Sequence, residues 1–433
     1  MNNELPTTTL VIFGITGDLA SRYILPALAK LDELGQLPEN FRLLGLSRRQ
    51  ISSEDVLKGE TSRLKKYLET TQMDMADPAD YQKLKEKLPA QGQKIFYLSI
   101  PPAAVMPILR RLSAAGLNHG NTKLLLEKPF GYDLESAREL ISEIEECFKE
   151  DQVYRIDHYM AKEMAQNISV FLGSNALFRK IWNNQFIDSI DIIAAEKIGI
   201  EGRADFYEQT GALRDIVQNH LMNLAALTLM RPCGSLFEFE DMPERRLEAL
   251  KSLKAADPNG AVRAQYDGYQ DEVSNERSLV ETFAAVTLES SDPRWHGVPI
   301  KLVTGKNLDT KVTEIRVRFK QTDESQANEL CLRIQPKEGV EIDLWAKQPG
   351  FSHDLRHLPL SFDYAQGAER LPNAYEQVLV DAMRSRTSLF AGAGEVLETW
   401  RVLQPILEHW QMNSNINTYK PGVAVEQVLE ADV

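Results

Sequence analysis

The segment Leu10-Val11-Ile12-Phe13-Gly14-Ile15-Thr16-Gly17-Asp18-Leu19-Ala20 decides the fold of the first part of the chain. Its first four residues form an apolar run typical of a buried strand, and a helix can begin after the glycines. Glycines at such a junction let the backbone approach a pyrophosphate, and the free amides and positive dipole end of the helix would bind it. The residues that we predict to contact a nucleotide are Gly14, Thr16, Gly17, Asp18 and Leu19.

This loop departs from the strict dinucleotide fingerprint, because Thr16 and Leu19 stand where the second and third glycines are expected. On this motif alone, a tight turn without a ligand remains an alternative. A second feature favours a ligand: the next strand, over residues 41–46, is followed by Ser47-Arg48-Arg49. An acidic residue there selects NAD, whereas arginine accommodates the 2'-phosphate of NADP. We therefore predict NADP, read by Arg48; the alternative is that both arginines are solvated surface charges.

The rhythm of the chain predicts two domains. Short apolar runs alternate with amphipathic stretches as far as residue 165, which indicates an α/β, doubly wound, Rossmann-like domain over residues 1–165. Longer alternating strands follow, so we predict an α+β domain over residues 166–433 with a large, mainly antiparallel sheet covered by helices. The predicted strands lie at 10–13, 41–46, 95–100, 123–126 and 153–156, then at 187–195, 280–288, 313–319, 329–334 and 340–345. Helical patterns cover residues 211–230 and the region after 373.

Composition excludes several classes of protein. A length of 433 residues exceeds one ordinary core, and the formal charge of -14 argues against broad binding to nucleic acid or acidic membranes. No apolar run approaches the roughly 18 residues that a membrane span needs. Residues 1–6 lack the features of a signal peptide, and three scattered cysteines fit a reducing compartment. We expect a cytoplasmic enzyme without a metal site, since no cluster of residues has ligand spacing.

Two segments are dense in polar residues. One covers residues 155–163, directly after a predicted parallel strand, where α/β enzymes place ligands. The other covers residues 211–220, and helical spacing puts His220 on the same face as Leu213, Ile216 and Val217. An isolated histidine on such an apolar face is more often a core residue with one hydrogen bond. The combination of the two segments argues for a functional role instead.

Read together, these segments resemble the glucose-6-phosphate dehydrogenase family. The block around Asp157 and the run that ends at His220 are the most specific matches, and the glycine loop alone is not specific. The matching blocks lie in the family's order and cover nearly the whole chain: 14–20, 127–131, 155–159 with 162–163, 201–203, 211–220, 305–306 with 311, 373–376 and 399–401.

The resemblance implies oxidation of C1 of glucose 6-phosphate to 6-phosphogluconolactone, with hydride transfer to NADP, as in the first step of the oxidative pentose phosphate pathway. It implies that His220 is the general base for the C1 hydroxyl and that Asp157 is its carboxylate partner, which suits the chemistry of imidazole. The implied phosphate-binding residues are His158, Tyr159, Lys162 and Lys311. Those implied for the sugar hydroxyls are Glu196, Asp215 and Lys306.

The same comparison implies that Lys128 contacts both substrate and cofactor, and that a cis bond can precede Pro129. We also assign Pro101 to the cofactor site. The family further suggests a homodimer or a dimer of dimers, assembled through the sheet of the second domain.

Some positions depart from the family pattern. Tyr23 stands where a functionally important lysine is expected, and Val303 stands where arginine is common. The residues at 391–395 also replace a usual charged segment. These changes leave three alternatives open: the same chemistry on a different or modified hexose 6-phosphate, a catalytically silent relative that binds NADP or sugar phosphate and regulates a partner, or a general Rossmann oxidoreductase.

Overall fold

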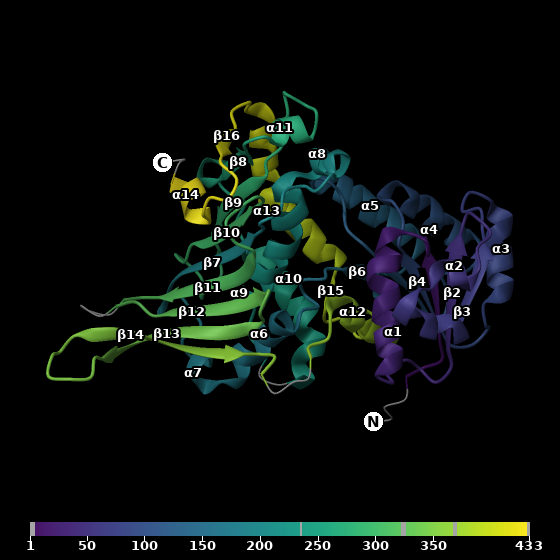
Figure 1. Ribbon diagram of the computed structural model, residues 1–433, viewed down its shortest axis with the longest axis horizontal. Helices are drawn as coiled ribbons and strands as arrows, with labels where there is room; N and C mark the ends of the chain where they lie inside the picture. The colour runs from purple at the N-terminus through teal and green to yellow at the C-terminus, as the bar shows by residue number, and fades with distance from the viewer. Residues whose placement is uncertain (1–4, 234–235, 322–325, 367–369, 431–433) are drawn as a thin grey trace. The chain divides into compact units, whose positions relative to one another are not determined.

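The computed structural model describes residues 5–233, 236–321, 326–366 and 370–430, and its chain divides into two compact units (Figure 1). Residues 1–4, part of the segment on which the prediction of no signal peptide depends, lie outside the described residues. The first unit comprises residues 1–131, 135–161 and 372–393, and the second comprises 132–134, 162–371 and 394–433. The domain boundary that we predicted after residue 165 places residues 372–393 in the second domain, whereas they belong to the first compact unit.

The sheet of the first unit has seven strands in the order β15-β6-β5-β4-β1-β2-β3. All neighbouring strands are parallel except β15 and β6. The order of the six parallel strands is that of a Rossmann fold, which confirms the predicted fold class. The strands are β1 (Thr8–Phe13), β2 (Phe41–Ser47), β3 (Leu68–Gln72), β4 (Gln93–Leu98), β5 (Thr122–Leu126), β6 (Val153–Ile156) and β15 (Phe390–Ala391).

Helices connect these strands because the intervening segments are amphipathic. In α1, for example, Leu25, Leu28 and Leu31 recur at helical spacing and are buried. The first helices are η1 (Ala20–Ile24), α1 (Leu25–Glu33), α2 (Ser53–Val56), η2 (Gly59–Lys66), α3 (Pro78–Lys87), η3 (Pro102–Ala104) and α4 (Val105–Ala114). They are followed by α5 (Leu134–Cys147), η4 (Glu150–Gln152) and, late in the chain, α12 (Ala374–Met383).

Buried polar contacts explain why α12 returns to the first unit. The Gln93 side chain donates to the carbonyl oxygen of Met383 at 2.8 Å and accepts from Lys123 Nζ at 2.8 Å. Lys123 also donates to the carbonyl oxygen of Ala382 and to Ser385 Oγ, so both side chains satisfy the carboxyl end of the helix. Burial lowers the pKa of Lys123 to about 8.

The second unit contains a nine-stranded sheet in the order β14-β13-β12-β11-β7-β10-β9-β8-β16. Its neighbouring strands are antiparallel except for the pairs β7 with β10 and β8 with β16, so the prediction of a mainly antiparallel sheet is confirmed. The strands are β7 (Ile187–Ala195), β8 (Val262–Tyr266), β9 (Phe283–Leu288), β10 (Ile300–Gly305), β11 (Val312–Phe319), β12 (Glu329–Gln335), β13 (Gly339–Lys347), β14 (Leu355–Asp363) and β16 (Asn417–Tyr419).

Helices accompany this sheet: α6 contacts β12, and α9 packs against both α6 and α10 (Figure 1). The helical pattern at residues 211–230 forms the end of α8, the π-helix η5 and α9, and η5 contacts β7, β9 and β10. The helices are α6 (Glu163–Ser174), α7 (Ala176–Arg179), α8 (Ala204–Ala212), η5 (Leu213–Leu221), α9 (Met222–Leu229), η6 (Leu236–Asp241), α10 (Met242–Ser252), η7 (Pro258–Gly260), α11 (Tyr269–Glu272), α13 (Ala393–Met412) and α14 (Val425–Glu430). Among the described residues, no helix combines the length and apolarity that crossing a membrane requires.

Candidate active site

The glycine loop follows β1, which lies between β2 and β4 in the sheet. Gly14 has a φ of 81°, and a Cβ atom there would lie 2.3 Å from the carbonyl oxygen of Ser99, so the position requires glycine. The Gly17 amide donates to the Gly14 carbonyl at 2.8 Å, which closes the turn before η1. This is the point where the strand order reverses, and doubly wound sheets bind ligands there.

A hollow of about 280 Å³ opens beside this loop. Its lining comes from the loop and from the carboxyl ends of β4 and β5: Gly17, Asp18, Leu19, Leu98, Ser99, Ile100, Pro101 and Glu127. Four residues predicted to bind the cofactor are among them, namely Gly17, Asp18, Leu19 and Pro101. Gly14 lies where the loop packs against the backbone of Ser99, and Thr16 is exposed at the surface of the loop. A loop that brings its backbone this close to a hollow fits the pyrophosphate of a dinucleotide.

A second hollow, of about 490 Å³, lies at the carboxyl ends of β2 and β3. It is lined by Arg48, Gln72, Asp74, Asp80 and Lys83. Lys83 is paired with Asp80 at 2.7 Å, and the Gln72 side chain donates to the backbone oxygen of Arg48 at 3.2 Å. Arg48 is exposed, as the prediction of a phosphate-binding group requires. The two hollows flank β1 on the same edge of the sheet, where the two halves of a dinucleotide would extend.

Glu127 begins the family block at residues 127–131 but is not among the predicted site residues. It follows β5, and its carboxylate accepts a hydrogen bond from the Tyr97 hydroxyl at 2.6 Å. Burial raises the pKa of Glu127 to about 7. Ser99 and Ile100 were missed as well. A signal for all three was available, because Glu127 directly follows one predicted parallel strand and Ser99 and Ile100 are the last two residues of another.

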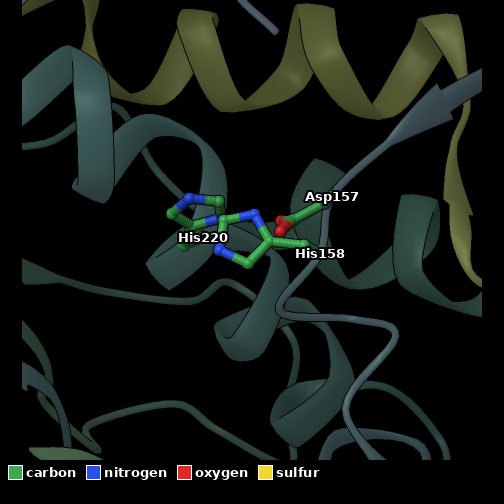
Figure 2. Close-up of side chains that lie close together, drawn as sticks. All are labelled: Asp157, His158 and His220. Atoms are coloured by element: carbon green, nitrogen blue, oxygen red, sulfur yellow. The ribbon is translucent and has the colours of Figure 1, made fainter. Parts of the chain in front are cut away.

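The remaining predicted residues of the first unit follow β5 and β6. Lys128 precedes a cis bond to Pro129, as we considered from the sequence. Asp157 is 2% exposed, and its carboxylate accepts the Tyr159 amide hydrogen bond at 2.9 Å, which fixes the turn after β6. The rings of His158 and Tyr159 meet edge to face, with centroids 4.9 Å apart. Figure 2 shows Asp157 and His158 at this turn, together with His220 from η5.

In the second unit, strand register explains the position of one predicted pair. β7 and β10 are parallel, with Ala195 opposite Gly305, so the next residues, Glu196 and Lys306, are neighbours. Their side chains form an ion pair, and Lys306 is 3% exposed. The ammonium group also lies over the ring of Tyr207, 5.4 Å from its centroid.

Lys311 belongs to the same edge of this sheet. Val312, the next residue, is paired with Ala195 in the antiparallel register of β11 and β7. Lys311 is exposed, and Lys162 is half-buried immediately before α6. The sheet thus gathers three residues predicted to bind substrate, Glu196, Lys306 and Lys311, from three different strands.

The helix η5 carries the other predicted residues of the second unit. His220 is 1% exposed and Asp215 is 8% exposed. Every residue of η5 except Arg214 is buried, so burial does not distinguish the face of His220 from the other faces of the helix, and the helix as a whole contacts β7, β9 and β10.

The first unit is that of a dinucleotide-binding protein, and comparisons with known proteins identify the family. Residues 11–167 match the NAD binding domain of glucose-6-phosphate dehydrogenase, and residues 169–430 match its C-terminal domain. The chain belongs to the glucose-6-phosphate dehydrogenase family.

Individual relatives agree. Glucose-6-phosphate 1-dehydrogenase 2 of Mycobacterium bovis is 36% identical, over 95% of this chain and 90% of the relative. Glucose-6-phosphate 1-dehydrogenase of Dickeya dadantii is 34% identical, over 95% and 93%. A solved glucose-6-phosphate dehydrogenase in complex with its substrate glucose-6-phosphate superimposes with a TM-score of 0.92, at 28% identity, over 100% of this chain and 99% of that one. The Mycobacterium avium enzyme gives a TM-score of 0.87 at 32% identity, over 97% and 95%.

The raised pKa of Glu127 predicts a pH-dependent stability. Between pH 4.5 and about 7, Glu127 keeps its proton in the folded state but has lost it in the unfolded chain. The contribution of Glu127 to the free energy of unfolding therefore falls as the pH rises through this window. Glu127→Gln removes this loss. The difference in free energy of unfolding between Glu127→Gln and wild type, measured in urea, should therefore increase in favour of the variant by about 2–3 kcal/mol from pH 5 to pH 8.

The exposed Glu139→Gln variant of the same unit is the matched control, with an expected change below about 0.5 kcal/mol. Parallel pH profiles for Glu127→Gln and wild type would contradict the prediction.

Proposed function

We propose that this chain oxidises C1 of glucose 6-phosphate to 6-phosphogluconolactone and transfers the hydride to NADP. The observation that carries the proposal is the full-length similarity of both units to glucose-6-phosphate dehydrogenases, one of them solved with glucose-6-phosphate. A nicotinamide cofactor, when bound, accepts the hydride. The residues of this chain then have to bind the sugar phosphate, hold its C1 toward the cofactor edge and remove the hydroxyl proton.

His220 takes the proton of the C1 hydroxyl in this proposal. An alcohol loses its proton as the hydride leaves C1, and imidazole titrates near working pH. Asp157 orients the ring and stabilises the imidazolium that forms. Two observations support these roles: both side chains are buried, and both belong to the blocks most specific to the family. The hydrogen bond from the Tyr159 amide would hold the carboxylate of Asp157 in one direction.

The sugar phosphate is held by charged and polar side chains. Glu196, Asp215 and Lys306 would bind the hydroxyl groups, and the buried ion pair of Glu196 with Lys306 would orient both side chains before substrate arrives. The proposed phosphate-binding residues are His158, Tyr159, Lys162 and Lys311, and Lys128 would contact substrate and cofactor. Lysine and histidine suit a dianion in a chain whose formal charge is -14, because local cations must then provide the attraction.

A specific feature favours a second candidate substrate. Tyr23 replaces an expected lysine, is 48% exposed and stacks on Tyr375 with ring centroids 5.2 Å apart. An aromatic pair presents an apolar surface where the family has a cation, so a modified or epimeric hexose 6-phosphate would be accommodated differently. The same oxidation on such a sugar is the alternative function.

An apolar surface supports a homo-oligomer, as a dimer or a dimer of dimers. Every residue of β14, the edge strand of the nine-stranded sheet, is exposed. Large apolar side chains are concentrated on β13 and β14: Trp345, Leu355, Leu358, Leu360 and Phe362. A long exposed apolar edge strand promotes aggregation unless another surface covers it. We propose a second copy of the chain as the partner, and a cytoplasmic location remains part of the same proposal.

NADP selectivity is tested at Arg48. A charge-assisted hydrogen bond to the 2'-phosphate contributes about 1.5–3 kcal/mol, so Arg48→Ala should lower kcat/KM for NADP by roughly 10- to 100-fold and leave that for NAD nearly unchanged. Arg49→Ala, the exposed neighbour, is the matched control. Equal efficiency with NAD and NADP in both wild type and Arg48→Ala would refute the role of Arg48.

The proton-transfer role is tested at His220. His220→Asn should lower kcat by about 100- to 10,000-fold while NADPH still binds, because the cofactor residues belong to the first unit. The exposed His296→Asn variant controls for the loss of a histidine in the second unit. Turnover and substrate affinity close to wild type in His220→Asn would show that another group is the base.

A further inference from the structure

The junction between α8 and η5 has an unusual backbone. Gly211 is buried and has a φ of 64°, which favours glycine. A Cβ atom at this position would lie 2.5 Å from Oε1 of Glu281. The missing side chain therefore leaves room for a carboxyl group to lie directly against the backbone, just before the helix that carries His220.

Glu281 uses this room to bind the start of η5. Its Oε1 accepts the Leu213 amide hydrogen bond at 2.8 Å, and its backbone oxygen accepts the Ala212 amide at 2.9 Å. The first amides of a helix have no partner within the helix, and a carboxyl group placed there satisfies them. Glu281 is 5% exposed, and burial raises its pKa. The buried carboxyl group thus contacts the first turn of the helix that carries His220.

The next residue connects the same point to the edge of the sheet. The Thr282 carbonyl accepts the Lys306 amide hydrogen bond at 3.0 Å, and Lys306 is paired with Glu196. Two consecutive residues thus contact two parts of the site. Glu281 accepts hydrogen bonds from the start of η5, and Thr282 accepts one from Lys306, a predicted substrate residue. The helix also contacts β9, which begins at Phe283.

We propose that Glu281 is a positioning residue for the reaction: it fixes the start of η5 so that His220 and Asp215 keep their place relative to Glu196 and Lys306. It would not touch substrate or cofactor. The inference rests on the proposed function, in which His220 is the base. A displacement of about 1 Å in a reacting group can lower the rate about 100-fold, so loss of this anchor should affect catalysis more than binding.

Three substitutions separate positioning from general stability. Glu281→Leu removes the acceptor, Glu281→Gln keeps an oxygen that can accept the Leu213 amide, and Glu281→Asp withdraws the carboxylate by one methylene group. Glu208→Leu is the matched control. Glu208 accepts hydrogen bonds from Tyr269, Asn275 and Ser278 in the same unit, and none of these donors lies on η5.

The experiment measures kcat and KM for glucose 6-phosphate per NADPH-binding subunit of the purified full-length enzyme. We expect Glu281→Leu to lower kcat at least tenfold with KM changed less than threefold, Glu281→Gln to stay within threefold of wild type, and Glu208→Leu to keep its kcat. If Glu281→Leu does not fold, Glu281→Asp should still lower kcat at least threefold at an unchanged melting temperature. Wild-type kcat in both Glu281→Leu and Glu281→Asp, or an equal loss in Glu208→Leu, would overturn the inference.

The outcome is distinct from failure of the proposed function. An active His220→Asn enzyme would remove the base that Glu281 is proposed to position. An inactive His220→Asn enzyme with fully active Glu281 variants would leave the base in place and refute only the positioning role.

Discussion

The close approach of Gly14 to the carbonyl oxygen of Ser99 is the constraint on which the cofactor half of the molecule depends. It brings the loop after β1 against the end of β4, and a side chain at Gly14 would separate them. Because β1 lies between β2 and β4, the two hollows at the carboxyl ends open on either side of this contact. The nucleotide-binding edge is thus a consequence of strand order and one glycine.

In the second unit, strand register rather than a glycine positions the predicted site residues. Most of its strands are antiparallel, but the parallel pair of β7 and β10 places the residues that follow both strands side by side. This register joins Glu196 to Lys306, and the antiparallel neighbour β11 brings Lys311 to the same edge. Charged groups gathered at a sheet edge keep their position without a long loop, which suits the recognition of a polar substrate.

Much of the fold could be predicted from the sequence, because apolar runs and their spacing specify buried strands. The predicted ranges leave out β3, β8, β10, β14, β15 and β16. Strand β10 is buried at five of its six positions, so its apolar run was overlooked, whereas β15 and β16 are too short to show a pattern. β3 has one buried residue out of five, and β14 has none out of nine. The return of α12 to the first unit was also unpredictable, since Gln93 and Lys123 reveal their partners only when the chain is folded. Periodicity predicted a helix over residues 211–230 but not the junction at Gly211.

The candidate site, like the fold, could be predicted only in part from the sequence. The burial of His220 agrees with helical spacing, although residues on the other faces of η5 are buried as well. Its role, like that of Asp157, came from resemblance and stays a prediction. The burial of Glu127 and Glu281 was not predicted, because an acid beside an apolar run resembles an exposed strand end and burial becomes visible only in three dimensions. Tyr23 shows the reverse case: the sequence marked it as unusual, and the structure adds its stacking on Tyr375.

The most direct test of the central claim is the initial rate of NADPH formation by the purified chain with NADP and a panel of hexoses and hexose 6-phosphates. The account predicts that glucose 6-phosphate is the best substrate and that free glucose, which lacks the phosphate, is turned over far more slowly. A higher kcat/KM for another hexose 6-phosphate, or no NADPH formation with any of them, would contradict it.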